Sequence, residues 1–319
     1  MGRFIARRLL QAIPTVFGIM LISFILLRIS PADPVKLMLP SDAEITEEDK
    51  DRLRTSLGLN KPLPVQFFDF VVQSATLDFG KSFYYNRPAR EMIFERIPNS
   101  IQPVLLGLLV GVVVGIPLGF VAALNRGRRP DHAIRVSSVL LNSTPDFFLG
   151  LLFILFLAIQ FKWFPIGSMN VVGVDCVFCW DRAWHLIGPV LLYANGSIAF
   201  YPRLIRTEVL EVLGQDFVRT ARAKGLQERV VMSGHVLRNA LIPVVTNFGA
   251  ILTIVFAGNV IVERVFNWPG LGRLFFDSLI QKDYPIIQAT LVMSAGLLLI
   301  SYIMRDITYA LIDPRIKVR

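Results

Sequence analysis

Residues 99–124 read NSIQPVLLGLLVGVVVGIPLGFVAAL, and no charged residue occurs from Ile97 to Asn125. A helix needs about 20 mostly apolar residues to cross a hydrocarbon core of about 30 Å, so this stretch can span a membrane once. Hydrophobic residues make up 54% of the chain and charged residues only 18%, against about 25% charged in a typical soluble domain. Because the apolar residues fall in several such runs, the sequence predicts an all-α membrane protein that crosses the bilayer repeatedly.

Six segments are candidates for membrane-spanning helices. They are residues 9–29, 99–124, 136–161, 186–202, 241–262 and 284–304. The first follows the basic residues Arg3, Arg7 and Arg8, as the apolar part of a signal peptide would. Its apolar stretch is longer than the roughly 7–15 residues of a signal peptide, and no small-residue cleavage site follows it. We therefore expect an uncleaved anchor helix and six transmembrane helices in all.

Lys and Arg gather in the pieces of chain that would lie on one side of the membrane. In residues 1–8, 125–135, 203–240 and 305–319, basic residues outnumber acidic ones. Cytoplasmic loops carry such an excess, so both termini are expected in the cytoplasm. The same asymmetry accounts for the formal net charge of +9 without a nucleic-acid partner.

The expected organisation follows from these spans. It comprises an N-terminal anchor helix at 1–29, an outer (periplasmic) segment at 30–98, a five-helix core at 99–312 and a cytoplasmic tail at 313–319. In the outer segment, Thr46 followed by Glu47 and Glu48 is typical of a helix start, with a hydroxyl cap and acids in the first turn. Gly58 is expected to end that helix, which makes the segment a small structured cap on the outer face.

The second span carries a glycine at every fourth position: Gly107, Gly111, Gly115 and Gly119. On a helix these positions form one stripe without side chains, which lets another helix approach closely. The stripe predicts helix packing. A functional alternative is that the close contact also slides during a conformational cycle.

The two cysteines, Cys176 and Cys179, lie in the outer loop between the third and fourth spans. In an oxidising compartment a local disulfide is the expected state. A structural zinc site typically takes four ligands, so two thiolates alone are too few, and metal binding with His185 as a further ligand is a minor alternative. Free thiols are the remaining alternative, and no metal site is expected.

Asp146 is the acidic residue that lies well inside an expected span. Ionisable residues at membrane depth usually face an aqueous cavity or a polar partner, so Asp146 is a candidate to line a polar pathway and to meet a cationic group there. The alternative is that the span starts near Pro145, which leaves Asp146 in a first turn at the interface.

Residues 208–225, EVLEVLGQDFVRTARAKG, lie in the expected cytoplasmic loop at 203–240. The small residues Ala221, Ala223 and Gly225 lie here among the basic residues Arg219, Arg222 and Lys224. This mix suits a short helix docked in the groove of a partner, because small residues allow close approach and basic residues set the orientation. The alternative from composition alone is a solvated basic loop beside anionic lipid headgroups.

No catalytic constellation stands out. Residues 75–82, ATLDFGKS, approach the phosphate-binding pattern G-x-x-x-x-G-K-[ST] but lack its first glycine, and they lie in the outer segment. His132, His185 and His235 fall in separate loops. We expect no catalytic residues, and if ATP drives this protein, another subunit must hydrolyse it.

Residues 220–225 (TARAKG) and 237–243 (LRNALIP) resemble the EAA-type loop of bacterial ABC importer permeases, in the peptide/nickel branch. Pro243 follows Gly225 at the longer spacing that is usual in this branch. Further similarity occurs at 8–14 (RLLQAIP), 31–34 (PADP), 57–66 (LGLNKPLPVQ), 96–98 (RIP), 263–272 (ERVFNWPGLG) and 283–285 (DYP). At position 32 the branch more often has glycine than alanine.

The resemblance implies a non-catalytic permease subunit, of the first-subunit type, in the bacterial inner membrane. It would pair with a second homologous permease and with two cytoplasmic ATPases that bind ATP and Mg²⁺. A periplasmic or lipid-anchored binding protein would deliver the substrate, and this chain itself would hold no cofactor. The coupling helix in an ATPase groove would be formed by Arg219, Thr220, Ala221, Arg222, Ala223, Lys224 and Gly225.

Dipeptides or oligopeptides are the leading substrates that the resemblance implies, with nickel, glutathione or opine-like compounds as alternatives. Nickel favours His or acidic ligands near the pathway, and among the span residues Asp146 alone offers one. A gradient-driven secondary transporter would need several intramembrane charges. A membrane enzyme would need a cluster of catalytic residues on one face. Both patterns are absent from the sequence.

Overall fold

The computed structural model describes residues 2–29, 46–56, 58–171, 173, 179–244 and 259–312. These residues are mainly helical, and they form no strand apart from an isolated bridge between Lys81 and Pro88. The chain divides into two compact units, Met1–Asn99 with Gly270–Ile303, and Ser100–Pro269 with Met304–Arg319. Residues 270–303 therefore belong to the same unit as the N-terminal part of the chain.

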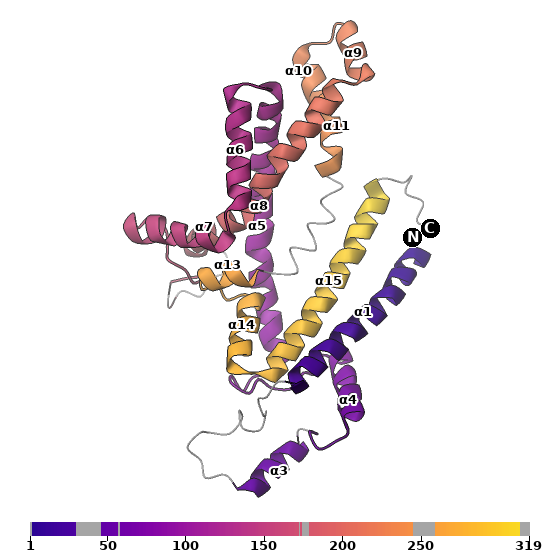
Figure 1. Ribbon diagram of the computed structural model, residues 1–319, viewed down its shortest axis with the longest axis vertical. Coiled ribbons are helices and arrows are strands. Elements are labelled where there is room, and N and C mark those ends of the chain that lie inside the picture. Colours follow the sequence, from indigo (N-terminus) through magenta and orange to yellow (C-terminus); the bar gives the residue numbers. More distant parts are fainter. Residues whose placement is uncertain are drawn as a thin grey trace. The chain divides into compact units, whose positions relative to one another are not determined.

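Unit 1 is built from helices at both ends of the sequence (Figure 1). They are α1 (Gly2–Ile29), α3 (Glu47–Ser56), α4 (Leu63–Ala75), the first part of α5 (Ala89–Leu124), α14 (Leu271–Gln281) and most of α15 (Tyr284–Ile312). The buried apolar faces of all these helices except α3 meet in one cluster that includes Phe24, Phe70, Ile93, Leu274 and Ile286. Helix α3 confirms the helix predicted after Thr46, and Gly58 follows it with φ +67°.

A buried carboxylate joins two loops of unit 1. Asp283, 1% exposed, accepts hydrogen bonds from the Ser82 hydroxyl and from the backbone N–H groups of Phe83 and Tyr84 at 3.2 and 3.4 Å. A buried charge needs such donors. The phosphate-loop-like stretch at 75–82 therefore ends in a structural contact to Asp283.

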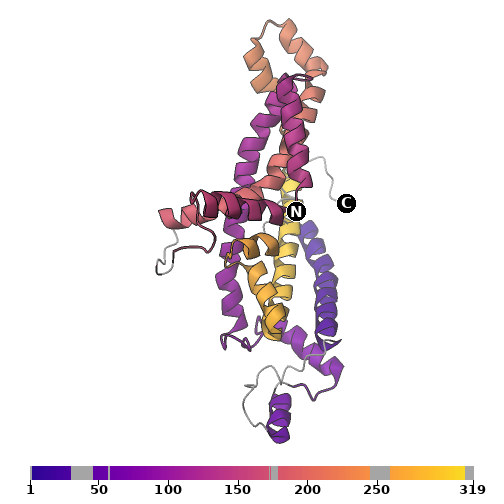
Figure 2. The ribbon, with the colours of Figure 1, turned by 60° about the vertical axis from the view of Figure 1, so that its left-hand side comes forward.

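Unit 2 holds the remainder of α5 and the helices that follow it (Figure 2). They are α6 (Arg129–Ser143), α7 (Asp146–Leu152), the π-helix η1 (Phe153–Gln160), α8 (Trp180–Leu213), α9 (Asp216–Ala223), α10 (Glu228–Val230), the π-helix η2 (Val231–Leu237), α11 (Arg238–Ala240) and α13 (Val260–Val265). Helix α8 contacts α6, α7, α11, α13 and η2, so it is the central element of this unit.

The glycine stripe of α5 packs directly on α8. A Cβ atom added at Gly107, Gly111, Gly115 or Gly119 would overlap the Cβ of a residue on α8. The four opposing residues are Tyr193, Ser197, Tyr201 and Ile205, which also recur at every fourth position. At Gly115 and Gly119 the distances would be 2.8 and 2.7 Å. The two backbones therefore approach as closely as they do because α5 has no side chains along this line.

The helices at the predicted spans differ from one another in length and straightness. Among the described residues, Ala89–Leu124 and Tyr284–Arg305 are long and apolar enough to cross a membrane, and α6 with α7–η1 makes a third candidate, bent by 101°. The apolar helix within α1, Ile13–Leu26, is shorter, and α8 extends the predicted span 186–202 at both ends. Most of the predicted span 241–262 lies outside the described residues.

The chain bends within the predicted span 136–161, and a helix starts after Pro145 as the alternative from the sequence has it. Pro145 disfavours the helical conformation at the residue before it, and Thr144 is extended, with φ −89° and ψ 125°. Helix α6 therefore ends at Ser143, and α7 starts a new direction at Asp146.

We expect Gly111→Ala to lower the free energy of unfolding by about 1–3 kcal/mol, the usual effect of overpacking, because its Cβ would overlap that of Ser197. The matched control is Gly196→Ala on α8, where an added Cβ meets nothing within 4 Å. The control should be neutral or slightly stabilising. Thermal unfolding of the purified variants measures both, and equal stability of the two would contradict the packing role of the stripe.

Candidate functional site

Helix α9 is held on the C-terminal half of α8 by a buried apolar cluster. Val218 and Ala221 on α9 are 0% and 5% exposed, and they pack with Val209, Val212 and Val231. The N-terminal end of α9 follows directly from α8 through Gly214 and Gln215. Burial of this apolar face fixes which side of α9 points outward.

The C-terminal end of α9 is closed by a glycine in the left-handed region. Gly225 has φ +76°, and its N–H donates to the Arg222 carbonyl at 3.0 Å while the Leu226 N–H donates to the Ala221 carbonyl at 3.4 Å. This is the Schellman arrangement, which favours glycine because a Cβ is unfavourable at that φ. Gly225 therefore sets where the chain leaves α9.

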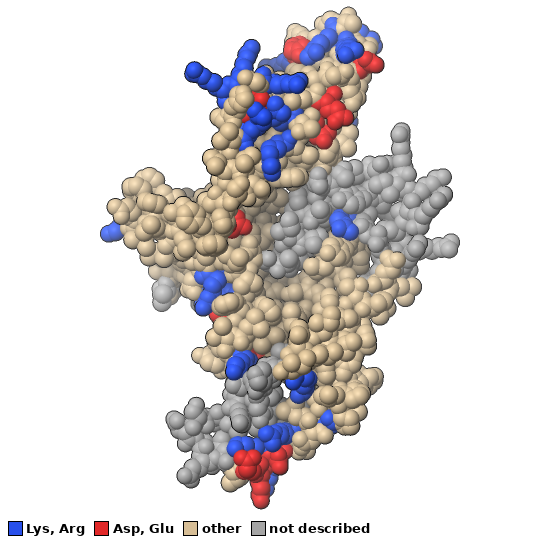
Figure 3. Space-filling view, in the orientation of Figure 1, with Lys and Arg blue, Asp and Glu red and all other residues tan. Residues whose placement is uncertain are grey.

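The outward face of α9 carries basic and small residues. Arg219, Thr220, Arg222, Ala223, Lys224 and Gly225 are exposed. Ala221 differs from the other small residues of the predicted docking helix, since it is buried against the chain itself and positions α9 rather than facing out. Figure 3 shows Lys and Arg side chains gathered at the end of unit 2 that carries α9 and the start of α6.

An ion pair closes the turn after α9. The Arg222 guanidinium donates from Nε and Nη2 to the two carboxylate oxygens of Glu228, at 3.1 and 2.6 Å. These hydrogen bonds hold the pKa of Glu228 below its usual range and raise the pKa of Arg222. Arg222 is therefore partly engaged within the chain, whereas Lys224 projects from the exposed end of the helix.

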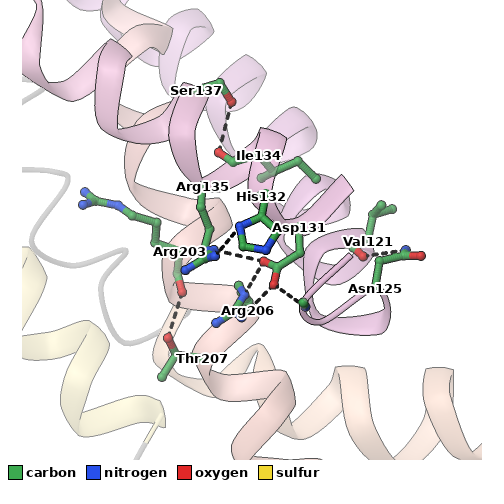
Figure 4. Close-up of polar contacts among 11 residues, drawn as sticks. Val121, Asn125, Asp131, His132, Ile134, Arg135, Ser137, Arg203, Arg206 and Thr207 are labelled. Atoms are coloured by element: carbon green, nitrogen blue, oxygen red, sulfur yellow. Dashed lines mark hydrogen bonds and ion pairs between the residues drawn. The ribbon is translucent and has the colours of Figure 1, made fainter. Parts of the chain in front are cut away.

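A second ion pair ties the start of α6 to α8 (Figure 4). Asp131 is 0% exposed and accepts two hydrogen bonds from Arg206, at 2.6 and 2.9 Å, and one from the Gly127 N–H at 2.8 Å. Arg135 Nε lies 3.3 Å from the same carboxylate. The pair fastens the turn between α5 and α6 to the helix that carries α9.

Asp146 is the first residue of α7, where the helix dipole favours an acid. The Asn195 side chain on α8 donates to Asp146 Oδ1 at 3.3 Å and to the Leu141 carbonyl at 3.3 Å. Asp146 is partly exposed, whereas Asn195 is 8% exposed and its Oδ1 has no hydrogen-bond partner in the described part of the chain. Asp146 thus lies at a bend between two helices, and a role in a pathway stays a prediction.

The cysteine pair is only partly described. Cys179 is disulfide-bonded and caps α8 by accepting from the Arg182 N–H at 3.5 Å. Cys176 lies outside the described residues, so its pairing stays a prediction. Within the described ranges, no group of three or more His, Cys, Asp or Glu side chains could hold a metal ion.

Two side-chain contacts of α8 could not be deduced from the sequence. Asp131 and Arg206 are far apart in the chain, and each lies among other charged residues in a segment that is expected to be cytoplasmic. Nothing in the sequence therefore indicates that they pair. Their only signal is the position of Asp131 in the first turn after Pro130, which is typical of a helix start. The pairing of Asn195 with Asp146 had no signal beyond the polarity of both residues within apolar stretches.

The chain belongs to the family described as the inner membrane component of binding-protein-dependent transport systems, whose model matches residues 115–318. The N-terminal part of such membrane components matches residues 1–103. The chain is therefore a membrane permease subunit of a transport system of the inner membrane, in a non-catalytic family. The resemblance noted in the sequence is confirmed.

Three relatives match along almost their whole length. The oligopeptide transport system permease protein AppB of Bacillus subtilis is 38% identical over 99% of this chain and 100% of its own. A putative peptide permease protein of Brucella ovis is 36% identical over 100% of both chains. A probable peptide ABC transporter permease protein of Sinorhizobium fredii is 36% identical over 99% of this chain and 100% of its own.

We expect Asp131→Asn to lower the free energy of unfolding by about 1–3 kcal/mol, because it leaves the half-buried Arg206 without its carboxylate. The matched control is Asp216→Asn, which removes the carboxylate of an exposed pair with Arg219 and should have no measurable effect. Thermal unfolding tests both. Equal midpoints for the two variants would show that the Asp131 pair does not stabilise this end of the unit.

Proposed function

We propose that the chain is one of two homologous permease subunits of an ATP-driven importer of dipeptides or oligopeptides. The names of the three relatives support the substrate class. The observation that carries the mechanism is the exposure of α9, whose apolar side is buried in its own unit while its basic and small side faces outward. A short helix presented in this way suits a groove on a cytoplasmic ATPase.

In this proposal residues 219–225 form the coupling helix. Two partner ATPases bind ATP and Mg²⁺, and their closure moves α9. Helix α8 receives that movement because Val218 and Ala221 pack on its C-terminal half, and the Asp131–Arg206 pair passes it to α6. This chain transmits work and lines half of the pathway, while a periplasmic or lipid-anchored protein delivers the peptide.

The proposed topology has six spans with both termini in the cytoplasm. It places α9, α10 and the start of α6 on the cytoplasmic side. The exposed basic residues at this end support that side, because cytoplasmic loops carry an excess of Lys and Arg. The bent pair α6 and α7–η1 then provides one span or a re-entrant segment.

Asp146 is the proposed contact for the cationic amino terminus of a peptide. It lies at the bend, is partly exposed, and is accompanied by the polar Asn195 on α8. Peptides differ in side chains but share this terminus, so one carboxylate could recognise many of them. A charge-assisted hydrogen bond of this kind contributes about 1.5–3 kcal/mol.

The proposed coupling helix is tested by three substitutions at Gly225. Gly225→Asp should abolish peptide uptake and weaken binding of the ATPases to this chain, because it puts a negative charge on the docking face. Gly225→Asn is the matched control, since Asn adopts a positive φ at least as well as Asp but carries no charge. Gly225→Ala tests backbone strain alone, at about 1–2 kcal/mol for a Cβ in the left-handed region.

The measurements are peptide uptake by whole cells and co-purification of ATPases with the chain in mild detergent, after membrane insertion of each variant is verified. We expect Gly225→Asn to keep most of the activity and the ATPases. Normal uptake and normal co-purification of ATPases in Gly225→Asp would contradict the proposal that residues 219–225 form the coupling helix. Recovery of the wild-type chain without a second permease or an ATPase would count against the importer itself.

For Asp146→Asn we expect the KM of peptide uptake to rise about tenfold or more, because the charge on the amino terminus of the peptide loses its partner. Asn keeps the size of the side chain and the ability to accept from Asn195. Asp181→Asn, in the first turn of α8, is the control and should leave KM unchanged. A wild-type concentration dependence in Asp146→Asn would remove Asp146 from the substrate contacts.

A further inference from the structure

A cavity of about 260 Å³ lies within unit 1, at the C-terminal end of α1. The loop before α4, α4 itself and the start of α15 form its other walls. Its polar lining includes Arg28 on α1, Lys61 in the loop, Asp69 on α4 and Gln288 on α15. None of these residues belongs to the sites described above.

An apolar groove of about 410 Å³ adjoins this cavity. It is lined by apolar side chains from α1 and α4, including Leu21, Ile25, Leu63 and Phe67, and both Phe24 and Arg28 line the cavity and the groove. Helices α1 and α4 contact each other and lie side by side there in Figures 1 and 2. Cavity and groove therefore make one site with a polar end and an apolar end.

Arg28 supplies a positive charge that the site does not neutralise. Lys61 Nζ lies 2.6 Å from Asp69 Oδ2, so these two charges compensate each other. The Arg28 guanidinium lies over the Phe24 ring, 5.3 Å from its centroid, and makes no ion pair within the described residues. An anionic group at the junction of cavity and groove would complete its hydrogen bonding.

A second polar side chain of the cavity, Gln66, has an acceptor atom without a hydrogen-bond partner in the described part of the chain. Gln66 is 8% exposed, and its Nε2 donates to the carbonyls of Leu59 and Lys61 at 2.9 and 2.6 Å, which fixes the orientation of the amide. Its Oε1 accepts no hydrogen bond among the described residues. Because an unpaired buried acceptor is unfavourable, a ligand with a hydroxyl donor beside its anionic group fits the cavity.

We propose that this site binds one anionic phospholipid with a hydroxylated headgroup, of the phosphatidylglycerol type. The phosphate pairs with Arg28, a headgroup hydroxyl donates to Gln66 Oε1, and one acyl chain lies in the groove. A water-soluble anion leaves the groove unexplained, since its Ile25 and Leu63 are 44% and 58% exposed. Arg28 also lies just beyond the apolar helix Ile13–Leu26, the depth at which basic side chains meet headgroups.

The test is a titration of phosphatidylglycerol into the delipidated, purified complex in mild detergent, with bound lipid counted by native mass spectrometry. We expect Arg28→Gln to bind the first lipid about tenfold more weakly, the effect of one lost charge-assisted hydrogen bond. Arg28→Lys, which keeps the charge, should bind with intermediate affinity. The matched control is Arg90→Gln, which removes an exposed charge of unit 1 outside the cavity and should bind as the wild type does.

The apolar end is tested independently by Leu63→Gln in the groove against Phe68→Gln, an exposed apolar residue on the same helix outside it. Only Leu63→Gln should weaken the first lipid, and it remains informative if Arg28→Gln fails to assemble. The proposal is overturned if Arg28→Gln and Leu63→Gln bind as the wild type does, or if both controls lose the lipid equally. Displacement of the lipid by inorganic phosphate alone would also overturn it, because the groove would then contribute nothing.

Discussion

The contact of the α5 and α8 backbones is the constraint on which unit 2 depends. Four glycines on one helix face four residues with the same spacing on the other, and an added Cβ at any of them would overlap its neighbour. A membrane environment gives little hydrophobic driving force between helices, so close packing must supply the attraction. Helix α8 is therefore fixed along its middle, which leaves its C-terminal half as a rigid support for α9.

The acidic side chains are buried where the fold supplies hydrogen-bond donors to their carboxylates. Asp283 in unit 1 and Asp131 in unit 2 are almost fully buried, and each accepts several hydrogen bonds from side chains and backbone. Glu263 is 0% exposed and accepts from the Ser100 hydroxyl at 2.7 Å. Asp146 differs, because it is partly exposed and accepts a hydrogen bond from a neutral amide, that of Asn195, at 3.3 Å. Partial exposure of Asp146 is what the proposed contact with a cationic amino terminus requires.

Patterns within one helix could be deduced from the sequence, whereas the residues that contact one another between helices could not. The glycine stripe, the helix after Thr46 and the small and basic residues of α9 depend on spacing along the chain, and spacing is visible in a sequence. That α8 receives the stripe, that Arg206 reaches Asp131, and that Ala221 faces inward are tertiary facts. Pro145 indicated an alternative helix start in the sequence, but apolar composition continues across it, so the 101° change of direction was not predicted.

The register of the glycine contact bears on how movement at α9 could reach the rest of unit 2. The Cβ atoms of Tyr193 and Tyr201 on α8 lie against glycine positions of α5. If α8 slid along α5, these Cβ atoms would leave the glycines and meet larger residues of α5. Such overlap is costly in a close-packed contact. We therefore expect α5 and α8 to move together, and sliding of the contact stays the alternative prediction. The 101° break between α6 and α7 lacks that constraint, because no helical hydrogen bond has to be broken there for the two helices to change direction.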